Sequence, residues 1–189
     1  YVRGIKAAIE ERHERALAAF RQAAELAPNE IEPRVAIVDE LLAAGRAREA
    51  RAEAQALLVR WPDDALAWRS WGRIEELAGN LLNAARAYER ALLSDAGDEQ
   101  AYLLAAHARS DLGEARAAIK LYQRLIARFP NAQQAHAGLG ELFWQERQFA
   151  PARAALERAV SLDPDHIEAR ERLADVLRAQ GELSLAVGE

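Results

Sequence analysis

The chain of 189 residues contains no cysteine, has only the lysines Lys6 and Lys120, and has no long apolar run. Without cysteine, neither a disulfide framework nor a thiolate site can form, and an oxidising compartment is permitted. No apolar run approaches the roughly 20 residues of a membrane-spanning helix, so we expect no direct membrane insertion. The formal net charge is −5. Nucleic-acid binders usually carry a basic surface, so nucleic acid is not an expected partner.

The sequence also lacks the patterns of a catalytic or metal centre. The histidines are His13, His107, His136 and His166, no two of which lie three or four residues apart, and no HExxH motif occurs. Both observations argue against a metal site. Asp111 follows His107 at helical spacing, but no nucleophile accompanies them, so a surface pair is expected. We therefore predict no catalytic residues, no metal, no cofactor and no enzyme activity.

What the sequence does contain is a repeat of 34 residues, seen clearly from Gln133 to His166. A fixed period of this size indicates an array of one small unit. The eighth position mostly holds a small residue: Gly4, Val38, Gly72, Ala106, Gly140 and Ala174. The twentieth position is always alanine: Ala16, Ala50, Ala84, Ala118, Ala152 and Ala186. Small residues at both sites allow the two helices of a unit to approach closely.

Other positions of the repeat hold large side chains or residues that end helices. The twenty-fourth position mostly holds a large side chain: Phe20, Ala54, Tyr88, Tyr122 and Leu156. The thirty-second is proline in all but one copy: Pro28, Pro62, Ala96, Pro130 and Pro164. Proline cannot continue a helix. The fifteenth is glycine in four copies: Gly45, Gly79, Gly113 and Gly181. Glycine suits a helix end that requires a positive φ angle.

Two copies show the whole pattern. One contains Trp68, Trp71, Gly72, Ala84, Tyr88 and Ala91, and the other contains Leu139, Gly140, Phe143, Ala152, Ala159 and Pro164. With these residues the chain resembles the tetratricopeptide repeat (TPR) family, bacterial type, over nearly its whole length. The resemblance implies an all-α fold, a right-handed superhelical solenoid of antiparallel helix pairs. It also implies a usual role in binding other proteins.

The period divides residues 1–189 into one solenoid of about five and a half repeats. Their ranges are 1–30 (partial), 31–64, 65–98, 99–132, 133–166 and 167–189 (partial). Each unit of such an array contacts its neighbours. The chain begins and ends inside expected helices, so we interpret it as a fragment of a longer protein.

Several local features follow from the repeat. The first repeat, residues 1–30, is expected to hold two helices, one ending near Ile9 or Glu10 and one from about His13 to Leu26. A continuous bent helix is the alternative. Arg147 replaces the turn glycine, which predicts a type I turn there. Asp63 and Asp64 are expected to cap the helix that follows them. The side chains predicted to point inward in the last unit are Leu173, Val176, Leu177, Leu183 and Ala186.

In the family, the first helix of each unit lines a concave groove, through positions 2, 5, 6, 9, 12 and 13. The resemblance therefore assigns this face a set of residues in the central units: Arg69, Arg73, Leu103, Leu104, His107 and Trp144. Tryptophan and arginine most often anchor interfaces. The alternative is that this surface is merely solvated. The lysine and asparagine clamp of the chaperone-binding members is absent, and so is the asparagine ladder of the glycosyltransferase-linked members.

Two charged residues stand where the family pattern has a large apolar side chain. Glu75 and Arg109 occupy the eleventh position of neighbouring units. A lone buried charge is costly, whereas a pair is much less so, so we hypothesise a Glu75–Arg109 salt bridge between adjacent first helices. The alternative is that each side chain reaches water independently.

These features favour a non-enzymatic scaffold that binds a protein or peptide partner in the groove. A bacterial envelope-assembly or exopolysaccharide-export system is the specific setting we consider, in the periplasm, with the cytoplasm as alternative. The competing hypothesis is a regulatory arm of a larger enzyme whose catalytic domain lies outside this chain. A third is self-association through exposed terminal repeats, because such repeats normally carry a polar cap.

Overall fold

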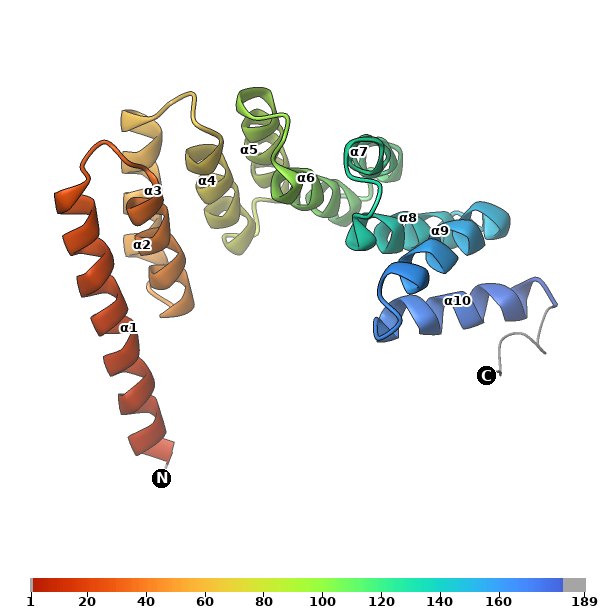
Figure 1. The fold of residues 1–189 in the computed structure, drawn as a ribbon, viewed down its shortest axis with the longest axis horizontal. Helices are drawn as coiled ribbons and strands as arrows, with labels where there is room; N and C mark the ends of the chain where they lie inside the picture. Colours follow the sequence, from red (N-terminus) through yellow and green to blue (C-terminus); the bar gives the residue numbers. More distant parts are fainter. Residues whose placement is uncertain (1, 182–189) are drawn as a thin grey trace. The chain divides into compact units, whose positions relative to one another are not determined.

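The computed structural model describes residues 2–181, and all the regular secondary structure in that range is helical. The helices are α1 (Val2–Leu26), α2 (Glu32–Ala43), α3 (Ala47–Arg60), α4 (Ala65–Leu77), α5 (Leu81–Ser94), α6 (Glu99–Asp111), α7 (Ala115–Arg128), α8 (Gln133–Gln145), α9 (Phe149–Leu162) and α10 (Ile167–Ala179) (Figure 1). The predicted all-α fold of consecutive helix pairs is confirmed. None of the described helices is both long enough and apolar enough to cross a membrane.

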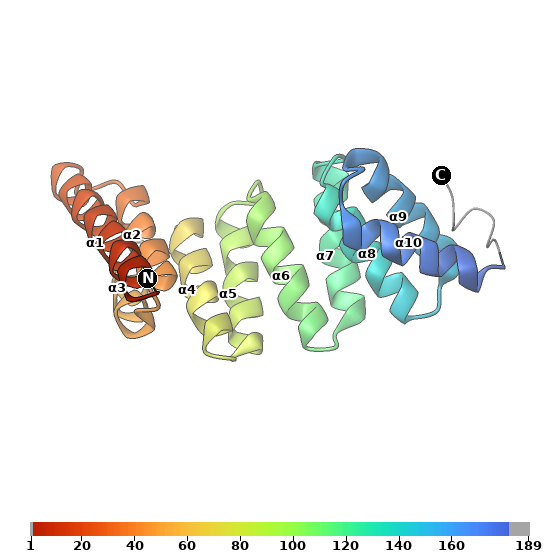
Figure 2. The ribbon, with the colours of Figure 1, turned by 90° about the horizontal axis from the view of Figure 1, so that it is seen from below.

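The helices form two compact units, Tyr1–Ala101 and Tyr102–Glu189, with the boundary inside α6. In the first unit α1 packs on α2, α2 on α3, α3 on α4 and α4 on α5. In the second, α7 packs on α8, α8 on α9 and α9 on α10 (Figure 2). Helices α2 and α4 also touch, as do α8 and α10, so the first helices of adjacent repeats lie side by side within each unit. Whether residues 1–189 form a single domain stays a prediction.

The N-terminal repeat is one helix rather than two. Helix α1 runs without interruption from Val2 to Leu26, and in Figure 1 it continues past the end of α2. The expected break near Glu11 is therefore wrong, and the continuous helix left open as an alternative is what forms. The segment between Ile9 and His13 contains glutamate and arginine, which favour helix, and neither glycine nor proline to end it.

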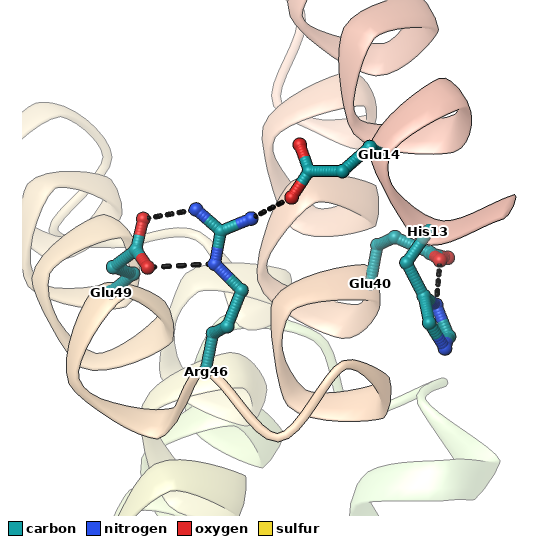
Figure 3. A network of polar contacts seen from close by, with 5 residues as sticks. All are labelled: His13, Glu14, Glu40, Arg46 and Glu49. Atoms are coloured by element: carbon teal, nitrogen blue, oxygen red, sulfur yellow. Dashed lines mark hydrogen bonds and ion pairs between the residues drawn. The ribbon is translucent and has the colours of Figure 1, made fainter. Parts of the chain in front are cut away.

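Polar contacts join α1 to the next two helices of the first unit (Figure 3). The His13 Nδ1 atom lies 2.5 Å from Glu40 Oε1 on α2. Arg46, in the turn between α2 and α3, donates to Glu14 on α1 at 2.6 Å and to both carboxylate oxygens of Glu49, at 2.7 and 2.6 Å. These contacts tie α1 to the α2–α3 hairpin on its polar side, while Leu17 of α1 is fully buried in the core.

Close helix packing occurs where the repeat places its small residues. Ala50, Ala84, Ala118 and Ala152, at the twentieth position, are all completely buried. A Cβ atom added to Gly72 would overlap the ring of Tyr88, and one added to Gly140 would overlap Leu156. Both contacts join the eighth and twenty-fourth positions of one repeat. The prediction that small residues allow the two helices to approach is thus confirmed.

The turns between paired helices share one backbone conformation. The φ angle is positive at all four predicted glycines, which have values of +73°, +76°, +74° and +78°: Gly45, Gly79, Gly113 and Gly181. Arg147 has a φ of 59°. The prediction of a type I turn at Arg147 is wrong, because the repeat imposes the same left-handed turn whether or not glycine is present. The backbone bonds agree, since Arg147 N donates to Trp144 O and Gln148 N to Phe143 O.

Other predicted details can be compared directly. Asp64 caps α4, accepting a hydrogen bond from Leu66 N at 2.7 Å, as expected, whereas Asp63 is exposed and makes no cap. In the last repeat Val176 and Leu177 are buried and Leu173 packs against the same core. The predicted inward residues Leu183 and Ala186 lie outside the described residues.

Candidate partner-binding groove

The first helices carry one polar side chain each at the ninth position of five successive repeats. These residues are spaced 34 apart: Asp39, Arg73, His107, Glu141 and Asp175. They come from α2, α4, α6, α8 and α10 in that order. Because the residues repeat at the period of the fold, each stands at the same place on its own helix. Within each unit, these residues mark the face of the first helices that the sequence analysis assigned to partner binding.

In the first unit, the arginines of this face already have partners. Arg73 on α4 forms an ion pair with Asp39 on α2. Arg69 Nη1 donates to both carboxylate oxygens of Asp98, at 2.8 and 2.9 Å. The Asp98 side chain is only 8% exposed and also accepts from Ala101 N at 2.9 Å. A carboxylate of a partner would therefore have to share each arginine with an aspartate.

In each unit a buried tyrosine lies against a polar residue of a first helix. The Tyr88 hydroxyl donates to Glu76 Oε2 at 2.6 Å. Burial raises the pKa of Tyr88 far above its usual value, and the hydrogen bond to Glu76 raises it further. Burial likewise raises the pKa of Tyr122, with a smaller effect from Asp111. The Tyr122 ring meets the ring of His107 edge-on, with centroids 6.0 Å apart, and so restrains that imidazole.

The second unit contains a cavity of about 320 Å³ on its first-helix face. Its apolar lining, which we call the floor, comes from α8, α9 and the start of α10, and consists of Ala137, Gly138, Leu156 and Ala169. Its polar lining, which we call the rim, comes from α6, α8, α10 and the residue before α10, and consists of His107, Gln134, Glu141, His166, Glu168 and Arg172. We name this space the second-unit cavity. It combines an apolar floor with a polar rim, as ligand sites usually do.

Arg172 is the arginine that lines this cavity, and it is already paired with two carboxylates. Its Nε donates to Glu141 Oε2 at 2.6 Å, and its Nη1 donates to Asp175 Oδ2 at 3.1 Å. The guanidinium carbon lies 5.5 Å from the Trp144 ring centroid, and Trp144 packs in turn on Phe149 at 5.5 Å. The Glu141–Arg172 pair joins α8 to α10, much as Asp39–Arg73 joins α2 to α4.

His166 has a structural role at the edge of the cavity. Its Nδ1 accepts a hydrogen bond from Ala169 N at 3.1 Å and thereby caps α10. An accepting Nδ1 carries no proton, so the Nε2 atom of the capping imidazole carries it. Glu168 Oε2 is 3.3 Å from Nδ1, and the Glu168 side chain is 84% exposed.

Some hydrogen-bonding groups of the cavity are unused. Among the described residues, neither the Gln134 amide nor the imidazole nitrogens of His107 have a hydrogen-bond partner, and both side chains are exposed. Glu168 has no arginine or lysine partner in the same part of the chain. These groups are available to a ligand without breaking an internal contact.

The six predicted groove residues fall in both units. Arg69 and Arg73 are in the first. Leu103, Leu104, His107 and Trp144 are in the second, where Leu103 is buried and Leu104 and Trp144 are half-buried. Only His107 of the six lines the cavity; Trp144 supports Arg172 beside it. The groove positions 2, 6 and 9 of the repeat also select Gln134, Glu141, Glu168 and Arg172. They do not include His166, which its place directly before the helix start at Ile167 could have indicated.

The hypothesised Glu75–Arg109 bridge joins residues of different units and stays a prediction. Within its own unit Glu75 is buried and accepts hydrogen bonds from Arg51 at 2.8 Å, Asn80 at 2.9 Å and Asn83 at 3.3 Å. Arg109 donates to Glu114 at 2.6 Å. The alternative that both side chains reach water fails for Glu75, because its side chain is only 3% exposed.

Among the side chains that the structure describes, no group of three or more His, Asp or Glu could hold a metal ion.

Comparison with known proteins decides the family. The sequence profile of the tetratricopeptide repeat matches residues 35–101, 103–167 and 141–189. The chain belongs to the TPR family. No curated protein sequence matches it significantly. Proteins of the family usually bind other proteins, so membership supports an interaction scaffold as the class of function.

Solved structures show the same fold at low sequence identity. MamA is 22% identical with a TM-score of 0.74, covering 80% of this chain and 88% of its own. YrrB, described as a TPR protein with an unusual peptide-binding site, is 18% identical with a TM-score of 0.72, covering 91% of this chain and 89% of its own. The Cut9–Hcn1 complex of the APC/C is 20% identical with a TM-score of 0.76, covering 90% of this chain but 34% of its own. These likenesses place the chain among the TPR solenoids.

Proposed function

We propose that this protein is a non-enzymatic scaffold that binds a segment of a partner protein along the face of its first helices. Arg69, Arg73, Leu104, His107 and Trp144 are the proposed contact residues on that face, whereas the predicted contact Leu103 is buried. The observation that carries the proposal is the second-unit cavity, which has an apolar floor and unused hydrogen-bonding groups on His107 and Gln134. The description of YrrB as peptide-binding supports the same mode of action for a protein of this fold.

The biological setting we propose is a bacterial envelope-assembly or exopolysaccharide-export system. The cysteine-free, arginine-rich and alanine-rich composition supports it only in permitting a periplasmic location. A regulatory arm of a larger enzyme is the alternative. The sequence flanking this chain in the parent gene separates the two, since a secretion signal favours export and a catalytic domain favours the arm.

The experiment is affinity capture of partners with matched variants. One variant carries His107→Ala and Gln134→Ala, which change two exposed residues of the cavity rim. The control carries Arg116→Ala and Gln123→Ala, two exposed residues of α7, the second helix of the same repeat as His107. Circular dichroism first verifies that both variants are folded. A partner retained by the control and lost by the cavity variant supports the proposal, whereas loss in the control alone places the binding surface on α7.

A further inference from the structure

The rim of the second-unit cavity contains more negative than positive charge. Arg172 faces Glu141 and Asp175, and Arg178 also donates to Asp175 at 2.7 Å. Two guanidinium groups are thus shared by these two carboxylates. Glu168 adds a third carboxylate, whose contact among the described residues is the His166 ring at 3.3 Å. Among the residues that the structure describes, Glu168 is therefore a carboxylate of the rim that no arginine or lysine neutralises.

The cavity also offers a place for an aliphatic stem. Leu156 and Ala169 are 1% and 2% exposed and form an apolar floor together with Ala137. Lysine and arginine side chains bury their methylene stems along such a surface while the charged end stays at the polar rim. The lining of this cavity thus combines buried apolar groups with the exposed acceptors Gln134 and Glu168.

We propose that the second-unit cavity binds a lysine or arginine side chain of the partner segment, with Glu168 and Glu141 receiving its charged end. The inference rests on the proposed function and specifies the chemistry of the partner. An acidic side chain would instead meet two carboxylates, and like charges at short distance repel. The one cation that lines the cavity, Arg172, is already held by two carboxylates and by Trp144. The Gln134 side-chain carbonyl and a His107 ring nitrogen supply further acceptors at the rim.

The proposal is tested with a random dodecapeptide library displayed on phage and selected against the intact protein. Peptides that bind are expected to contain at least one lysine or arginine in a recurring position. The strongest peptide is then synthesised in three forms, with that basic residue, with glutamine and with glutamate in its place. Their dissociation constants are measured by fluorescence anisotropy at low and at high salt.

Matched protein variants identify the carboxylate. Glu168→Gln removes one charge from the rim at an exposed site, while Glu171→Gln removes one charge from the same helix at an exposed residue that does not line the cavity. We expect Glu168→Gln to weaken binding of the basic peptide about two- to fivefold, as for exposed ion pairs. Glu171→Gln is expected to leave the affinity unchanged. The difference between the two should shrink at high salt, because ions screen exposed charges.

Two failures are distinguishable. Suppose that peptides bind, and that the His107→Ala/Gln134→Ala variant binds them more weakly, but that the dissociation constant depends neither on the basic residue of the peptide nor on Glu168→Gln. The cation inference is then wrong, and the proposed function stands. If no peptide is selected, or binding is insensitive to the cavity changes, the proposed function and the inference both fall. Equal thermal melting of Glu168→Gln and Glu171→Gln excludes unfolding as a cause.

Discussion

Replacing Arg147 with glycine should stabilise the second unit. Arg147 has a φ of 59° in a turn where four other repeats have glycine, and its side chain is exposed. A left-handed conformation costs an L-residue about 1–2 kcal/mol. Glycine avoids this cost, but it loses more backbone entropy on folding, which destabilises the folded state by about 0.5–1 kcal/mol. The expected net gain is therefore about 0.5–1 kcal/mol.

The reciprocal change provides the control. Gly113 has a φ of +74° and the same turn hydrogen bonds, from Gly113 N to Ser110 O and from Glu114 N to Arg109 O. A Cβ atom there would meet nothing within 4 Å, so Gly113→Arg changes the backbone preference without a steric clash. We expect Gly113→Arg to destabilise the second unit by the same net amount, about 0.5–1 kcal/mol.

Urea unfolding followed by circular dichroism measures both changes. Hydrogen–deuterium exchange of α8 and α9 locates the effect of Arg147→Gly, which matters because repeat arrays do not always unfold in one step. The reasoning is refuted if Arg147→Gly leaves stability unchanged or lowers it while Gly113→Arg is tolerated without loss.

Three further changes probe other parts of the account. Gly72→Ala should cost about 1–3 kcal/mol of stability, because the added methyl group overlaps the Tyr88 ring, and Tyr88→Leu in the same chain should recover part of the loss. Unfolding in urea measures both variants. A Gly72→Ala protein of unchanged stability would contradict the close packing of Gly72 on Tyr88. Burial raises the pKa of Tyr122 in the folded state, so the unfolded chain releases the Tyr122 proton at a lower pH than the folded protein. The free energy of unfolding should therefore fall as pH rises above about 10, by up to about 1.4 kcal/mol per pH unit. Tyr122→Phe should flatten this dependence of stability on pH, and an unchanged slope would exclude Tyr122 as its source. His166→Ala should lose about 1 kcal/mol with the cap of α10, whereas His166→Asn should retain most of it, as thermal melting can verify; equal losses in both would rule out a capping role.

The periodic part of this structure could be predicted from the sequence. Gly45 and Pro62 stand at the helix-ending positions of the repeat, and α3 (Ala47–Arg60) lies between them. This succeeds because helix ends depend on local residues, such as the glycine before α3 and the Trp61-Pro62 pair after it. The small residues at the eighth and twentieth positions likewise predicted that the helices of a pair approach closely, and the contact of Gly72 with Tyr88 is the form that this approach takes.

The departures arise where one repeat constrains another. Arg147 adopts the turn of its neighbours because the helices on both sides already fix the path of the chain. The break expected near Glu11 did not form, since no residue there ends a helix. The local sequence therefore explains why α1 is continuous, whereas the surrounding fold explains the conformation of Arg147.

The candidate site was predictable as a face but not as a cavity. The helical register placed His107, Glu141 and Arg172 on the first-helix surface. It could not show that Arg73 is paired with Asp39, or that Arg172 is held by Glu141 and Trp144. Such pairs depend on the distance between helices and on side-chain conformation, which a repeat pattern does not contain. Which charges remain for a partner is consequently visible only in three dimensions.

Site-specific photo-crosslinking tests the central claim most directly. Benzoylphenylalanine is introduced at His107 or at Gln134 on the cavity rim, and at Arg116 or Gln123 on α7 as controls. Each protein is irradiated in extracts of cells that express the parent protein, and the crosslinked products are identified by mass spectrometry. The account predicts one partner segment crosslinked from both rim positions and from neither α7 position. A partner crosslinked from α7 and not from the rim would contradict it.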